Sequence, residues 1–319
     1  MNKTAFLFPG QGSQFVGMAK DLYEAYPEVR ETFDQAESIL KFSLKSLCFE
    51  GPEDELKQTR YTQPAIFTHS YAVDGLLKKH GIYPGCVAGH SLGEYSALVS
   101  AGALSFEDGL RLVKIRGELM QISGEKNPGT MAAIIGATPE VVAEACAEAA
   151  STGIVQPANY NCPGQLVISG SIPGVHRAME LAKEKGARIA KALTVSGAFH
   201  SPLMEDALKG LVQALDDVEI RDSKIPVYSN VEALPVTSGD KMRQLLKQQL
   251  LSPVLWENII RNMISDGFAQ FYEVGPGQVL RGLLRRIDRK HLCRAVGAAE
   301  EIETLNTKNQ IENTLGKKI

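Results

Sequence analysis

One stretch constrains the fold more than any other: "CVAGHSLGEYSALVSAGA" at residues 86–103. Its apolar start is typical of a buried strand, and the small residues after Leu92 favour a helix. Ser91 lies between the two in a G-x-S-x-G frame, with Gly89 and Gly93 at the flanking positions. Such a frame marks a sharp strand-to-helix turn of α/β folds that exposes the serine hydroxyl in a cleft. We therefore predict a nucleophilic serine; the alternative is a tight turn with an incidental serine.

Strand and helix signals alternate along much of the chain, which predicts an α/β fold. The segments 4–8 ("TAFLF"), 226–231 ("PVYSNV") and 268–275 ("FAQFYEVG") have the composition of strands. Helical periodicity begins near Pro64 and stops at Gly81, a residue typical of the position after a helix end.

The pattern changes in the middle of the chain. Residues 130–193 predict the order βαββαβ, which is the ferredoxin-like arrangement. We therefore expect an inserted small domain at 128–196, so that a large catalytic domain comprises 1–127 and 197–319. The last residues, from about Glu300 to Ile319, are polar and weakly periodic and are predicted to form a loose tail.

Composition and charge argue against several functions. The formal net charge of the 319 residues is -3, so no global basic field would hold nucleic acid. No apolar run approaches the ~18 residues needed to span a membrane. The five cysteines are scattered, odd in number and without a C-x-x-C pair. That spacing argues against a disulfide framework or a zinc site and favours a reducing cytoplasm.

A glycine-rich loop, "FPGQGSQ" at 8–14, follows the first predicted strand. It lacks the third glycine of a dinucleotide fingerprint and the lysine of a phosphate loop, so we do not expect it to bind a nucleotide. Its glycines allow the backbone to approach another group closely, for example as oxyanion donors.

A nucleophilic serine needs a general base, which is usually histidine. Of six histidines, His200 is the best candidate, because it lies in the loop "SGAFHSPLM" between a strand and a helix, where α/β folds place catalytic groups. His90 adjoins Ser91, but neighbours on such a turn usually point apart. The alternative for His200 is a loop histidine with a purely structural hydrogen bond.

Arg116 lies on the apolar side of a helix predicted from Phe106 to about Gln121. At about 100° per residue the other charged residues share one stripe, whereas Arg116 projects among Leu112, Val113, Leu119 and Met120. A buried cation is costly unless it is paired, so Arg116 needs a carboxylate. The protein could supply it as an internal ion pair, or an acidic substrate could supply it to a bidentate clamp.

A second basic feature is the helical segment "RGLLRRIDRKHLCR", which carries Arg281, Arg285 and Arg286. The favoured interpretation is a solvated helix face. The alternative is a docking patch for an acidic partner.

Taken together, seven motifs resemble the malonyl-CoA:acyl carrier protein transacylase family, whose members serve type II fatty acid synthesis or act as discrete polyketide synthase acyltransferases. The resemblance covers about residues 4–290 in order, and its joint specificity is far higher than that of G-x-S-x-G alone. The motifs are "FPGQGSQ" at 8–14, "TQPA" at 62–65, "GHSLGEYSALV" at 89–99, "RG" at 116–117, "GAFHS" at 197–201, "QLLSPVLW" at 249–256 and "EVGPG" at 273–277.

The resemblance implies a role for each matched residue. Ser91 would be the acylated nucleophile and His200 its base. The histidine would be oriented by a backbone carbonyl at Gln249 rather than by a carboxylate. The N–H groups of Gln11 and Leu92 would form the oxyanion hole.

The same resemblance implies a substrate and a reaction. Arg116 would bind the free carboxylate of malonyl, and Phe199 matches a malonyl-selective loop that disfavours an α-methyl branch. Malonyl would pass from malonyl-CoA through Ser91 to the phosphopantetheine thiol of an acyl carrier protein, without a metal or redox cofactor. The implied fold is an α/β-hydrolase-like large domain with a ferredoxin-like insertion, in agreement with the strand and helix pattern.

Two other classes of protein remain open at this point. A serine hydrolase or thioesterase would use the same turn, would not require Arg116, and would release free acid. A non-catalytic interaction subunit could keep the fold, but the intact set of Ser91, His200 and Arg116 argues against it.

Overall fold

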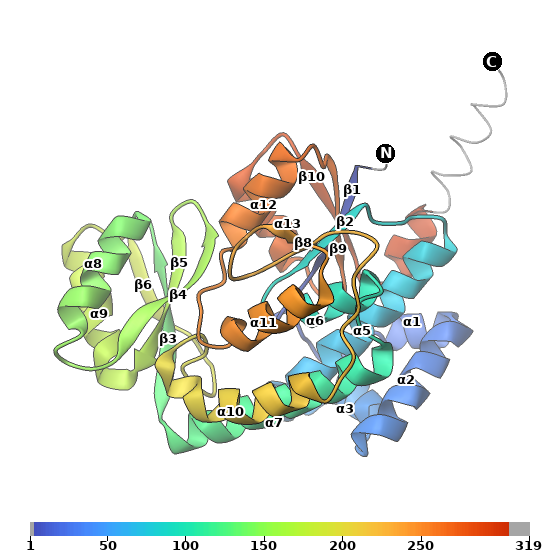
Figure 1. Cartoon of the computed structure of the whole chain (residues 1–319), viewed down its shortest axis with the longest axis horizontal. Helices are drawn as coiled ribbons and strands as arrows, with labels where there is room; N and C mark the ends of the chain where they lie inside the picture. Colours follow the sequence, from blue (N-terminus) through green and yellow to red (C-terminus); the bar gives the residue numbers. More distant parts are fainter. Residues whose placement is uncertain (1–2, 306–319) are drawn as a thin grey trace.

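The computed structural model describes residues 3–305, which form a large and a small α/β unit side by side (Figure 1). The large unit is built on a six-stranded sheet of order β10-β9-β1-β2-β7-β8. Neighbouring strands are parallel except for β7 and β8, which are antiparallel. The strands are β1 (Thr4–Phe8), β2 (Cys86–Gly89), β7 (Val227–Tyr228), β8 (Pro235–Val236), β9 (Gln270–Val274) and β10 (Leu292–Val296).

Strand β1 lies inside the sheet and is buried along its whole length. Successive side chains of a strand point to opposite faces, so β1 contributes to two cores. Phe6 and Phe8 belong to the larger core, whereas Ala5 and Leu7 belong to the second. A strand of a parallel sheet that is covered on both faces is apolar along nearly all its length, which explains the uninterrupted apolar run "AFLF" at 5–8.

Helices cover both faces of this sheet. The second core is closed by α12 (Trp256–Ser265) and α13 (Val279–Ile287). Other helices contribute to the larger core: α1 (Lys20–Ala25), α2 (Pro27–Leu40), α3 (Leu44–Glu50), α4 (Glu53–Leu56), α5 (Thr59–Lys79), α6 (Gly93–Ser100), α7 (Phe106–Lys126), the 3₁₀ turn η1 (Pro202–Met204), α10 (Glu205–Asp216) and α11 (Gly239–Gln249).

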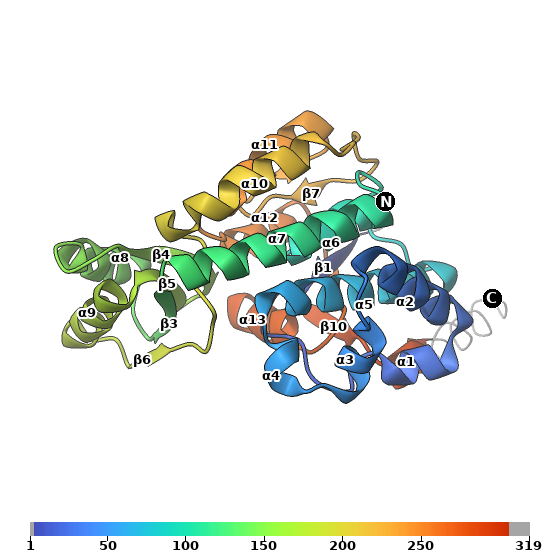
Figure 2. The ribbon, with the colours of Figure 1, turned by 90° about the horizontal axis from the view of Figure 1, so that it is seen from below.

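Helix α7 packs against both α5 and α10 (Figure 2). The predicted start of α5 near Pro64 is wrong, because the helix begins at Thr59 and contains the proline. Thr59 and Gln63 are fully buried, so the first turn is held by tertiary packing that the local sequence does not reveal. Helix α7 also extends beyond the predicted end near Gln121, to Lys126.

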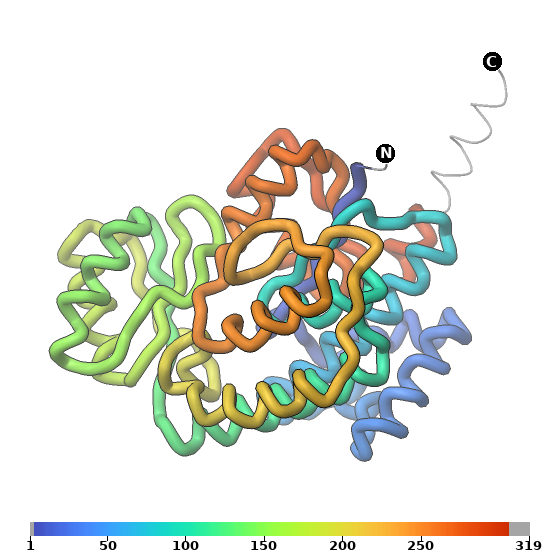
Figure 3. Tube along the Cα trace, in the orientation of Figure 1, coloured from blue at the N-terminus to red at the C-terminus, as the bar shows by residue number. Residues whose placement is uncertain are grey.

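The small unit is an antiparallel sheet of order β4-β5-β3-β6 with two helices packed on it. If β3, β4, β5 and β6 are numbered 1 to 4, the order read from β6 is 4-1-3-2, which is the order of ferredoxin-like folds. Figure 3 shows the chain entering the unit after α7 and returning to the large unit before α10. Its elements are β3 (Gly129–Ile135), α8 (Pro139–Ala149), β4 (Val155–Cys162), β5 (Gln165–Ser171), α9 (Ile172–Glu184) and β6 (Ile189–Ala192).

The expected loose tail is wrong for its first residues. Residues 299–305 are helical, and Ile302 and Leu305 are buried in the larger core. Two apolar side chains one turn apart provide enough burial to hold this segment, although the surrounding sequence is polar. Residues 306–319 of the predicted tail lie outside the described part. Within residues 3–305 no helix is both long and apolar enough to cross a membrane.

Candidate active site

Ser91 occupies the turn between β2 and α6, in a left-handed backbone conformation with φ 51°. Both flanking glycines are required by close backbone packing. A Cβ at Gly89 would lie 1.8 Å from the carbonyl carbon of Gly93, and one at Gly93 would lie 2.1 Å from the carbonyl oxygen of Phe8. The G-x-S-x-G frame therefore presses the start of α6 against two strands and leaves the serine at the apex of the turn.

Asn230 holds this turn from just beyond the end of the neighbouring strand β7. Its Oδ1 accepts a hydrogen bond from the Ser91 N–H at 2.7 Å, and its Nδ2 donates to the Gly89 carbonyl at 2.7 Å. The side chain is fully buried. A left-handed conformation costs a non-glycine residue about 1–2 kcal/mol, and these two hydrogen bonds offset that strain.

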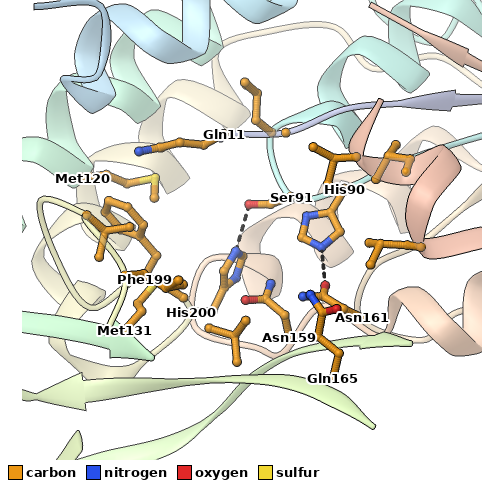
Figure 4. Close-up of a pocket in the computed structure, with 18 of the residues that line it drawn as sticks. Gln11, His90, Ser91, Met120, Met131, Asn159, Asn161, Gln165, Phe199 and His200 are labelled. Atoms are coloured by element: carbon orange, nitrogen blue, oxygen red, sulfur yellow. Dashed lines mark hydrogen bonds between the residues drawn. The ribbon is translucent and has the colours of Figure 1, made fainter. Parts of the chain in front are cut away.

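His200 lies within reach of the serine (Figure 4). Its Nε2 is 2.8 Å from Ser91 Oγ, and its Nδ1 is 2.9 Å from the Gln249 carbonyl and 3.1 Å from the Ser252 carbonyl. Carbonyl oxygens only accept, so Nδ1 carries the hydrogen and Nε2 is free to take the serine proton. No carboxylate of the described chain takes part in this pair.

Two effects keep His200 neutral. Burial and the nearby Arg116 charge lower the pKa of its imidazole to about 3, although hydrogen bonds to the two carbonyls oppose the shift. A neutral imidazole is the form that accepts a proton. The other histidine beside the serine points away: His90 Nε2 lies 2.9 Å from Asn161 Oδ1 (Figure 4). The His90 ring packs against Trp256.

Arg116 is 1% exposed and reaches the serine. Its Nη2 donates to Ser91 Oγ at 3.1 Å and to Gln249 Oε1 at 3.1 Å, and its Nη1 donates to Gln63 Oε1 at 2.9 Å. The Nε atom has no partner among the described residues. Within that part of the chain no carboxylate oxygen lies within 4.0 Å of the guanidinium, so the direct internal ion pair considered from sequence does not form. The cation is solvated by neutral amides and keeps N–H groups for a ligand.

Ser91, His200 and Arg116 line one pocket of about 210 Å³, which lies between the two units. Gln11, Leu92 and Phe199 line it as well. Among the described residues the backbone N–H groups of Gln11 and Leu92 have no hydrogen-bond partner, and such groups can stabilise an oxyanion. Phe199 lies with Met120 and Met131 on an apolar side of the pocket, away from the amides of the small unit (Figure 4).

Comparisons with known proteins agree with this geometry. Residues 5–310 match the family model described as "Acyl transferase domain". The chain belongs to this family. It is 48% identical over 304 residues to the malonyl CoA-acyl carrier protein transacylase of Bacillus subtilis (strain 168), covering 95% of this chain and 96% of the relative. The corresponding protein of Escherichia coli (strain K12) is 44% identical over 288 residues, with 90% and 93% covered.

Two solved structures extend the comparison. An acyl carrier protein S-malonyltransferase from Vibrio cholerae superposes with a TM-score of 0.92 at 42% identity, covering 95% of this chain and all of that one (100%). A malonyl-transacylase solved in complex with a type II polyketide synthase acyl-carrier protein also gives a TM-score of 0.92, at 40% identity, with 96% and 99% covered. The family and the fold predicted from the sequence are therefore confirmed.

Sequence reasoning missed several polar residues that complete the site. Asn230 supports the turn, Gln63 binds Arg116, and Glu94 is buried behind Gln249. Two signals were present: Asn230 lies near the end of a predicted strand, and Gln63 lies in the motif "TQPA". Neither signal identifies the partner of the side chain, because each partner comes from a distant element.

The basic helix α13 borders the pocket. Its apolar residues Leu280 and Leu283 line the cavity, whereas Arg285 and Arg286 are exposed on its other side. Arg286 donates to Gln165 of the small unit at 2.6 Å. The positive charges of α13 therefore lie outside the pocket but next to it.

Proposed function

We propose that this protein transfers a malonyl group from malonyl-CoA to the phosphopantetheine thiol of an acyl carrier protein, through a malonyl ester of Ser91. One observation carries the proposal: a buried guanidinium without a carboxylate partner lies 3.1 Å from the nucleophile. The names of the relatives and the carrier-protein complex of a similar enzyme support the same reaction.

In the first half-reaction the Ser91 hydroxyl attacks the thioester carbonyl of malonyl-CoA while His200 Nε2 takes its proton. The carbonyl oxygen becomes an oxyanion, which the N–H groups of Gln11 and Leu92 stabilise. Collapse of the tetrahedral intermediate breaks the carbon–sulfur bond. The coenzyme A thiolate then leaves as the thiol, with the proton returned by His200.

Arg116 selects the acyl group. Malonyl has one methylene between its two carbonyl carbons, so an ester on Ser91 Oγ places its carboxylate close to a guanidinium that already contacts that oxygen. The carboxylate then forms the pair that Arg116 lacks. Phe199 narrows the apolar side of the pocket, which disfavours an α-methyl branch.

The second half-reaction reverses the first with a different thiol. His200 takes the proton of the phosphopantetheine thiol, the thiolate attacks malonyl-Ser91, and the returned proton restores the serine hydroxyl. The chemistry needs no metal or redox cofactor, and we propose a cytoplasmic location. The positive face of α13 at Arg281, Arg285 and Arg286 is the proposed docking surface for the acidic carrier protein.

Intact-mass measurement after mixing with malonyl-CoA tests the proposal. We expect a malonyl adduct that is absent in Ser91→Ala and is discharged by holo acyl carrier protein. Rapid release of malonate without the carrier protein would instead identify a hydrolase. The absence of any adduct and of any turnover would contradict both enzyme classes.

A further inference from the structure

Glu94 is a buried carboxylate that the reaction above does not use. It lies in the first turn of α6, three residues after the nucleophile, and is 4% exposed. In the described part of the chain no cationic nitrogen lies within 4.0 Å of it. Buried carboxylates are rare unless they are paired. The Glu94 carboxylate, buried beside the nucleophile, therefore needs a partner within the protein.

That partner is the side-chain amide of Gln249. Its Nε2 donates to Glu94 Oε2 at 2.7 Å and to the Ser91 carbonyl at 2.9 Å, while its Oε1 accepts from Arg116 at 3.1 Å. A flipped amide would set its oxygen against a carboxylate and a carbonyl, and its NH₂ against a guanidinium. The two charged side chains therefore fix the amide in one orientation.

The amide also separates the two charges. A direct Glu–Arg ion pair would occupy N–H groups of the guanidinium that a carboxylate ligand needs. With Gln249 between them, Glu94 supplies a negative charge near Arg116 without occupying those groups. The main chain of Gln249 meanwhile accepts from His200, so one residue joins the base to the acyl-binding cation.

We infer that Glu94 is a positioning residue that acts through Gln249: it fixes the amide against Arg116 and weakens, by its charge, the attraction of Arg116 for the malonyl carboxylate. This inference rests on the proposed function. A weaker attraction favours transfer, because an acyl group bound too tightly would pass slowly from Ser91 to the acceptor thiol. Burial raises the pKa of Glu94 to about 7, while its hydrogen bonds to Gln249 and Asn230 and the charge of Arg116 oppose the rise.

The near-isosteric Glu94→Gln variant isolates the charge, because its Oε1 can still accept from Gln249. At pH 8.5, where the native carboxylate is ionised, we expect the KM for malonyl-CoA to fall at least threefold. The KM for acetyl-CoA, which has the same coenzyme but a neutral acyl group, should stay within twofold. Ser96→Ala in the same helix is the matched control, since its buried hydroxyl has no partner among the described residues. It should change neither value.

A double-mutant cycle tests the route through Gln249. Glu94→Ala should lower kcat/KM for malonyl-CoA at least tenfold, and Glu94→Ala with Gln249→Ala should be no worse than Gln249→Ala alone. An unchanged or raised malonyl-CoA KM in Glu94→Gln, or multiplicative effects in the cycle, would overturn the inference. Failure of the proposed function is distinguishable, because it would appear in the wild-type protein as the absence of a malonyl-Ser91 adduct.

Discussion

Replacing Asn230 by alanine tests whether the strained turn is held by a single side chain. Asn230→Ala removes both the acceptor of the Ser91 N–H and the donor to the Gly89 carbonyl, each at 2.7 Å. Nothing else in the described structure bonds the Ser91 N–H. Ser91, the proposed nucleophile, would then have to keep its left-handed conformation without the hydrogen bonds that offset its strain.

The expected cost follows from counting the groups left without a partner. Leaving a buried donor or acceptor unsatisfied costs ~1–3 kcal/mol per group. Two such groups therefore lower the free energy of unfolding by about 2–6 kcal/mol. Relaxation of the turn would also move Ser91 Oγ away from His200. We expect the acylation rate to fall about 10- to 100-fold, which is the effect of losing roughly 1.4–2.7 kcal/mol in the transition state.

Urea unfolding gives the stability, and single-turnover release of coenzyme A thiol from malonyl-CoA gives the acylation rate. Asn262→Ala is the control, since its Nδ2 bonds a single carbonyl, that of Ala233, outside the site; it should cost less stability and leave the rate unchanged. Asn230→Asp should not rescue, because it sets a carboxylate oxygen against the Gly89 carbonyl. This account of the turn would be refuted if Asn230→Ala lost under ~0.5 kcal/mol of stability and acylated at the wild-type rate. Such a loss is well below the ~1 kcal/mol expected for even one unsatisfied group.

Three further predictions concern selectivity, pH and docking. Arg116→Ala should lower the malonyl-to-acetyl ratio of kcat/KM about 100-fold or more, because a neutral acyl group in the native protein leaves a buried guanidinium unpaired at about 3–5 kcal/mol; an unchanged ratio would remove the selectivity argument. Since the folded pKa of His200 is depressed to about 3, its neutral form persists far below pH 6.5, and acylation at saturating malonyl-CoA should show no acid limb near 6.5. The unfolded chain protonates His200 at about pH 6.5, whereas the folded protein protonates it only near pH 3. The free energy of unfolding should therefore fall as the pH drops from about 6.5 towards 3, which acid titration of the fold would detect. Charge reversal at Arg285 should raise the KM for carrier protein and spare that for malonyl-CoA, and equal effects on both would exclude docking on α13.

The parts of the site that sequence predicted are those whose chemistry is local. The turn around Ser91 is marked by a frame of five residues. Gly89 contacts backbone of the turn itself, whereas Gly93 contacts the end of the neighbouring strand β1. His200 was selected by its place in a loop after a strand, and Arg116 by its position on an apolar helix face. In each case the residue type and its immediate neighbours carry the signal.

The residues that sequence missed depend on contacts between distant elements. Asn230 lies 139 residues from Ser91, and Glu94 lies 155 residues from Gln249. Glu94 reads from sequence as an ordinary acidic residue in the first turn of a helix, where it suits the helix dipole. Only the folded chain shows that it is buried. The first turn of α5 was missed for the same reason, since tertiary packing rather than local propensity holds it.

The arrangement around Arg116 shows how a buried cation can be kept ready for a ligand. A carboxylate in direct contact would stabilise the guanidinium but would compete with malonyl for the same N–H groups. Water would stabilise it too, but would also hydrolyse an acyl-serine. Two neutral amides, from Gln63 on α5 and Gln249 on α11, avoid both problems, because they solvate the charge without cancelling it. In the proposed reaction the malonyl carboxylate supplies the ionic partner that Arg116 lacks, so the selectivity proposed for a charged acyl group would follow from the absence of an internal carboxylate partner.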